Sequence, residues 1–159
     1  MRTITLVFTL ISFFLFSSTS FSSTSHQQIA ELLAQEQAPS GVVFEIVTGA
    51  ANGLQWALPR THKMIKQLRE RFPKLDVAIV AHGNEQFALQ ESNNKKYKKV
   101  HSLTEQLTQK ENVPLHVCGT YASWRDVTEE DFPDYVDVTT AGPATINDYI
   151  ALGYTLIKL

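Results

Sequence analysis

The chain alternates short apolar runs with longer amphipathic stretches, and this alternation restricts its fold more than any other feature. Five runs have the length of strands and contain few charges: Val42–Val47, Leu75–Ala81, Val113–Cys118, Tyr135–Thr139 and Tyr154–Leu159. The segments between them are too long for hairpins, and Leu54–Phe72 carries apolar residues at helical spacing. Strands that alternate with helices predict a parallel sheet with helices packed on it.

We therefore expect an α/β domain with a doubly wound, five-stranded parallel sheet. Right-handed crossovers favour a flavodoxin-like strand order of 2-1-3-4-5. In that order the third strand, which ends at Cys118, lies beside the first strand, and the first strand separates it from the strand that ends before His82. A capping box at Thr128–Asp131 predicts a short acidic helix, and Gly142-Pro143 predicts the start of a helix that Gly153 ends.

The first 25 residues have the pattern of a secretory signal peptide. Arg2 precedes an uncharged, mostly apolar run from Ile4 to Phe16, and small residues follow through Ser25. The apolar run is short for a bilayer span, which makes an uncleaved membrane anchor the weaker alternative. We thus predict a signal peptide at residues 1–25, a polar helix and linker at 26–40, and an α/β domain at 41–159 in the periplasm.

Composition limits the possible partners and the redox chemistry. The formal net charge is −2, which gives no electrostatic reason to expect nucleic acid or a membrane surface as partner. The mature chain of roughly 130 residues is one domain. It has one cysteine, so an intramolecular disulfide is impossible. A solitary thiol in an exported protein is either buried and inert or reactive.

Cys118 is the candidate catalytic residue because it ends a strand and precedes a glycine and a helical turn. Ligands of open α/β sheets bind at the carboxyl ends of the strands, and backbone N–H groups at a helix start favour an anion such as a thiolate. Gly119 allows close backbone approach, and the amides of Thr120 and Tyr121 can point toward the sulfur. The alternative interpretation is a buried cysteine that acts as a small hydrophobic residue.

Three further polar residues are candidates for supporting roles. His116 lies two residues before the cysteine on the same face of its strand, where a histidine packed under a helix is the alternative. His82 follows the second strand and Asn52 follows the first, so both belong to the same edge of the sheet as Cys118. A turn histidine that bonds its own loop is the alternative for His82.

The sequence indicates no cofactor and no metal site. The loop at Thr48–Gly53 lacks the glycine spacing of a dinucleotide fingerprint or a P-loop. No second cysteine is available for dithiol chemistry, and Cys118, His116 and His82 lack the paired spacing of zinc ligands.

Taken in order, several of these segments resemble the DsrE/DsrF-like family. The resemblance is carried by Val42–Gly49, Val80–Gly83, Val113–Gly119, Gly142-Pro143 and Leu152–Lys158. It implies the flavodoxin-like fold, assembly into a small homo-oligomer and, as in sulfur-relay members, a persulfide on Cys118. The partners it implies are a sulfur donor or acceptor protein, or a small sulfane-sulfur compound. The leading hypothesis is an exported sulfur carrier, and the alternative is a non-catalytic oligomeric binding module of the envelope with a structural cysteine.

Overall fold

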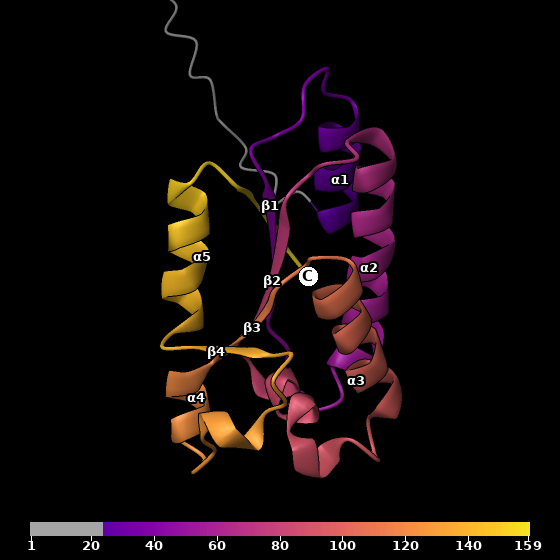
Figure 1. Ribbon diagram of the computed structural model, residues 1–159. Coiled ribbons are helices and arrows are strands. Elements are labelled where there is room, and N and C mark those ends of the chain that lie inside the picture. Colours follow the sequence, from indigo (N-terminus) through magenta and orange to yellow (C-terminus); the bar gives the residue numbers. More distant parts are fainter. Residues whose placement is uncertain (1–23) are drawn as a thin grey trace, which may run out of the picture.

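The computed structural model describes residues 24–159 and shows one parallel sheet with helices on both faces (Figure 1). The strands are β1 (Val42–Ile46), β2 (Val77–Ala81), β3 (Leu115–Cys118), β4 (Asp137–Thr139) and β5 (Thr155–Lys158). The predicted fold class, an α/β domain with five parallel strands, is confirmed. The predicted signal peptide lies almost wholly outside the described residues.

The strand order differs from the predicted 2-1-3-4-5. The sheet runs β4-β3-β2-β1-β5, so β2 pairs with both β1 and β3. The chain steps across the sheet in one direction from β1 to β4 and then returns past β1 to add β5 at the other edge. The apolar pattern defines the strands but says nothing about their neighbours, because every interior strand of a parallel sheet is buried on both faces.

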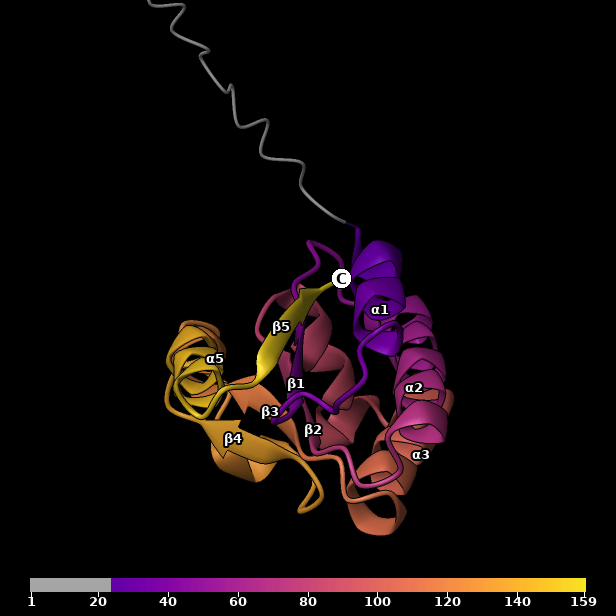
Figure 2. The same ribbon diagram turned by 90° about the horizontal axis from the view of Figure 1, so that it is seen from above.

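Helices cover the two faces unequally. Three helices, α1 (Ser25–Leu33), α2 (Leu54–Arg71) and α3 (Lys98–Glu105), lie on one face, and α5 (Gly142–Ala151) lies on the other (Figures 1 and 2). Side chains alternate between the faces along each strand. Phe44 therefore joins the large core under α1–α3, while Val43 and Val80 join a smaller core with Ile146 of α5.

Several connections contain 3₁₀ or π turns in place of regular α-helix. The segment after β2 forms 3₁₀ turns, η1 (Asn84–Leu89) and η2 (Glu91–Asn93), and α3 continues into a π-helical turn, η3 (Gln106–Lys110). The predicted capping box is present at η4 (Glu129–Asp131). Helix α5 begins at Gly142-Pro143 as predicted, and Gly153, at a φ of 87°, follows its end.

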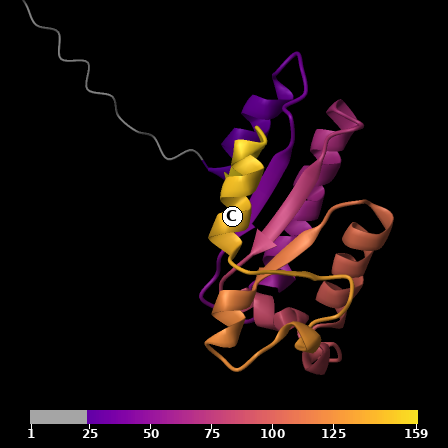
Figure 3. The ribbon, with the colours of Figure 1, turned by 60° about the vertical axis from the view of Figure 1, so that its left-hand side comes forward.

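The short helix α4 (Gly119–Ser123) lies at the carboxyl ends of the strands, below α5 in the view of Figure 3. No helix among residues 24–159 is long and apolar enough to cross a membrane. Because all the strands are parallel, the connections after β1, β2, β3 and β4 all start at the same end of the sheet, where the strands have their carboxyl ends.

Candidate functional site

The connections after β1 and β2 are tied together by a fully buried carboxylate. Glu85 accepts the backbone N–H of Thr48 at 2.6 Å and that of Gly83 at 2.7 Å. Asn84 adds a side-chain bond to the carbonyl of Gly49 at 2.9 Å. A buried carboxylate is tolerated where donors satisfy its oxygens, so Glu85 fixes these two loops as one rigid layer beside the end of β3.

Gln86 holds the last residue of β3. Its side-chain oxygen accepts the Cys118 N–H at 2.8 Å, and its side-chain nitrogen donates to the Cys118 carbonyl at 3.3 Å. Gln86 is fully buried, and its amide takes the place of the next backbone unit of β2. The backbone of Cys118 is thereby satisfied although β2 has already ended at Ala81.

The Cys118 side chain caps α4, as expected for a residue between a strand and a helix. Its Sγ accepts the N–H of Tyr121 at 3.4 Å, which confirms one of the two predicted amide contacts. The Thr120 N–H instead donates to the carbonyl of Thr140 at 3.0 Å. The Cys118 residue is buried, with only 5% of its surface exposed.

The connection between β4 and α5 packs against α4 next to the thiol. A Cβ on Gly119 would lie 3.0 Å from the carbonyl oxygen of Thr139, so a larger residue here would crowd this carbonyl. The Thr120 hydroxyl donates to the Thr140 carbonyl at 2.6 Å. Gly119 and Thr120 therefore both contact the segment 139–142, which packs next to the sulfur.

His82 directly follows β2, the strand next to that of Cys118, which corrects the predicted separation by β1. The pairs Val80–His116 and Ala81–Val117 continue by one residue to set His82 opposite Cys118 on the α5 face. No hydrogen bond joins the two side chains among residues 24–159. His82 and Cys118 are neighbours because β2 lies between β1 and β3.

The His82 ring hydrogen-bonds to Glu45 on the neighbouring strand β1 and not to its own loop. Its Nε2 lies 2.9 Å from one oxygen of Glu45, and the Lys158 Nζ lies 3.1 Å from the other. Burial alone would raise the pKa of Glu45, but the interactions with His82 and Lys158 hold it below its usual value. Gly142 packs on His82, since a Cβ there would lie 2.6 Å from the Cβ of the histidine.

His116 is the packed histidine of the alternative interpretation. Its Nε2 lies 2.9 Å from the hydroxyl of Tyr149 on α5, and its Nδ1 lies 3.7 Å from a carboxylate oxygen of Asp137. Burial lowers the pKa of His116, and Asp137 opposes that shift only in part. Asn52 lies exposed in the turn before α2, and no hydrogen bond connects its side chain to another residue of 24–159.

An aromatic and cationic cluster beside α4 was not foreseen from the sequence. The Tyr121 hydroxyl donates to Asn84 at 2.7 Å and accepts from Arg125 at 3.2 Å. The Arg125 guanidinium lies 5.0 Å from the centre of the Phe87 ring, and Trp124 is 74% exposed at the margin. Glu85 and Gln86 were missed as well, and the only available signal was their position directly after a strand.

Fold and site together define an α/β domain whose single cysteine ends an interior strand of a parallel sheet and caps the following helix. The model of the DsrE/DsrF-like family matches residues 13–159. The chain therefore belongs to the DsrE/DsrF-like family.

The chain is similar to two solved structures at low sequence identity. MTH1491 from Methanobacterium thermoautotrophicum, described as a protein of unknown function, is 19% identical, with a TM-score of 0.60 over 74% of this chain and 97% of its own. The ychN protein from E. coli is 16% identical, with a TM-score of 0.48 over 75% of this chain and 99% of its own. No curated protein matches the sequence.

Proposed function

We propose that the protein is a sulfur carrier in which Cys118 accepts a sulfane sulfur as a persulfide and passes it to an acceptor. Membership of the DsrE/DsrF-like family supports this proposal. The observation that carries it is the place of the thiol, at the end of β3 with its Sγ accepting the Tyr121 N–H at 3.4 Å. A donor aimed at sulfur stabilises the thiolate, which is the nucleophilic form.

The transfer needs no redox partner. The Cys118 thiolate attacks the outer sulfur of a donor persulfide, R–S–SH, and forms a new S–S bond. The donor S–S bond breaks, R–S⁻ leaves with the electron pair, and Cys118 carries –S–SH. With thiosulfate as donor, sulfite leaves in the same way and the cysteine keeps the negative charge as –S–S⁻.

Access to the thiol requires a local opening, because Cys118 is 5% exposed. The segment 139–142 is the element we propose to move, since it is joined to α4 through the Thr120 hydroxyl at 2.6 Å. The variant Thr120→Val keeps the shape of the side chain and the backbone bond to Thr140 but loses the hydroxyl donor. We expect faster alkylation of Cys118 in this variant, and no change in Thr108→Val, which loses a comparable hydroxyl bond within α3 and η3.

The decisive experiment is sulfur loading of the native protein. After incubation with thiosulfate or a persulfide donor, intact mass spectrometry should show a gain of about 32 Da, one sulfur atom, which is absent in Cys118→Ser. If the native thiol neither gains sulfur nor reacts with alkylating reagents, while it reacts in urea, the carrier proposal is wrong.

The second candidate function is a non-catalytic binding module with a structural cysteine. The burial of Cys118 favours it, and so do the exposed side chains Trp124 and Leu152, which are available for contact with a partner or a second copy. In that case Cys118→Ala should leave partner binding and oligomeric state intact. If the protein is a sulfur carrier, the same substitution should abolish sulfur transfer.

Export and partners belong to the same proposal. We infer that residues 1–25 direct the chain to the periplasm and that the mature protein forms a homo-oligomer that meets a donor or acceptor there. The Thr24 hydroxyl accepts the Gln27 N–H at 3.4 Å as the N-cap of α1, so cleavage after Ser20 or Ser22 preserves the helix start, whereas cleavage after Ser25 removes it. N-terminal sequencing of the exported protein distinguishes these sites.

A further inference from the structure

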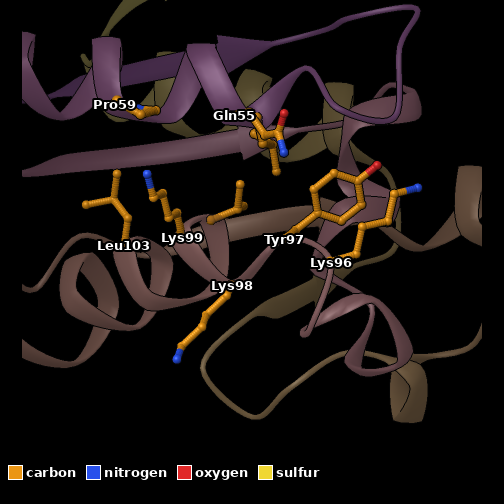
Figure 4. A pocket seen from close by; sticks show the side chains of 9 residues that line it. Gln55, Pro59, Lys96, Tyr97, Lys98, Lys99 and Leu103 are labelled. Atoms are coloured by element: carbon orange, nitrogen blue, oxygen red, sulfur yellow. The ribbon is translucent and has the colours of Figure 1, made fainter.

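A groove of about 470 Å³ lies between the amino-terminal parts of α2 and α3 (Figure 4). These two helices cover the face of the sheet opposite α5 (Figure 1). Its apolar floor contains Leu54 and Val100, which are buried, and the partly exposed Leu103. The groove shares no lining residue with the surroundings of Cys118. Its volume falls within the range of small-molecule sites.

Positive charge is concentrated on one wall of this groove. Lys96, Lys98 and Lys99 line it, and its lining contains no aspartate or glutamate. None of the three lysines forms a salt bridge with another residue of the described chain. The ammonium group of Lys99 points into the groove, whereas that of Lys98 points away from it (Figure 4). The Lys96 Nζ lies 5.0 Å from the centre of the Tyr97 ring.

The two adjoining helices strengthen this potential. Helix α2 begins at Leu54 in the lining, and α3 begins at Lys98. Neither helix has a side-chain N-cap bond or an acidic residue in its first turn. Helix starts favour negative charge, so lysines at this end of α3 oppose its dipole. An anion in the groove would relieve both the lysine repulsion and this mismatch.

We propose that the groove binds a small organic anion with an apolar body. Its acidic head would lie at the ammonium group of Lys99, which points into the groove (Figure 4), and its apolar part would cover Leu54, Val100 and Leu103. The proposal is independent of the sulfur chemistry at Cys118, since it rests on different residues and a different face of the sheet. We expect binding to need both the charge and the apolar part of the ligand, because the lysines and the apolar side chains line the same cavity.

The ligand class is tested with fluorescent anilinonaphthalene sulfonate bound to the full mature protein. Decanoate, which has both an acidic head and an apolar chain, should displace it. Inorganic phosphate and decanol, which each supply one half of that chemistry, should not do so at the same concentration. Displacement by phosphate alone would reduce the site to a simple anion patch and overturn the proposal, as would equal displacement by decanol.

Three variants locate the binding. Lys99→Gln should weaken decanoate about two- to fivefold, the usual range for one exposed charge contact, while Lys98→Gln makes the same charge change on a side chain that points away and should have little effect. Gln55→Glu places a carboxylate in the first turn of α2 within the lining, so it should weaken decanoate yet raise the melting temperature. Equal losses of decanoate affinity in both lysine variants, or unchanged affinity in Gln55→Glu, would show that decanoate does not bind in this groove.

Discussion

The end of β3 depends on one buried amide, and replacing it with an apolar side chain of similar size measures that dependence. In Gln86→Leu the Cys118 N–H and carbonyl lose their side-chain partners, which lie at 2.8 and 3.3 Å. Each buried backbone group left without a partner costs about 1–3 kcal/mol. The leucine adds apolar burial that offsets about 1–2 kcal/mol. We therefore expect Gln86→Leu to lower the free energy of unfolding by about 1–4 kcal/mol, a large part of the stability of a single domain.

Urea denaturation of the purified protein gives this free energy, and Gln67→Leu is the matched control. Gln67 lies exposed on α2, so its replacement should change stability by no more than about 0.5 kcal/mol. Hydrogen exchange adds a local readout. In Gln86→Leu the Cys118 amide should lose more protection than the amide of Leu115 at the other end of β3, because only the former loses its partner.

The refuting result is specific. If Gln86→Leu unfolds at the same urea concentration as the wild type while the Cys118 amide keeps its protection, Gln86 does not hold the strand end. A stability loss with uniform loss of protection along β3 would show that the substitution acts on general packing and not on the Cys118 backbone.

Three further outcomes follow from the same edge of the sheet. Gly119→Ala should cost about 1–3 kcal/mol in urea, because its Cβ would lie 3.0 Å from a β4 carbonyl, whereas Gly49→Ala, with nothing within 4 Å, should be near neutral. The pKa of Glu45 is lowered, so its ionised form stabilises the fold above about pH 4.5 and that contribution is lost as the pH falls further; the stability deficit of Glu45→Gln should shrink below that pH. The pKa of His116 is also lowered, so its NMR titration midpoint should lie below 6.5, and the fold should lose stability as the pH falls from 6.5 toward that midpoint.

The sequence by itself determined the local structure. Apolar runs marked all five strands, and the spacing of leucines and the position of Pro143 and Gly153 marked the helices that separate them. These signals depend on residues within one or two turns of each other, so they are visible in the sequence without any knowledge of long-range contacts. The place of Cys118 between a strand and a helix is of this kind, and it was predicted correctly.

Only the tertiary structure decided what surrounds the thiol. The predicted strand order failed because apolar composition is the same for every interior strand, and the placement of β2 between β1 and β3 depends on long-range packing. That placement brings Gln86 to the backbone of Cys118 and sets His82 at the end of the neighbouring strand, where its ring contacts Glu45 of β1. The burial of the sulfur arises in the same way, since it comes from segments far apart in sequence that close over one edge of the sheet.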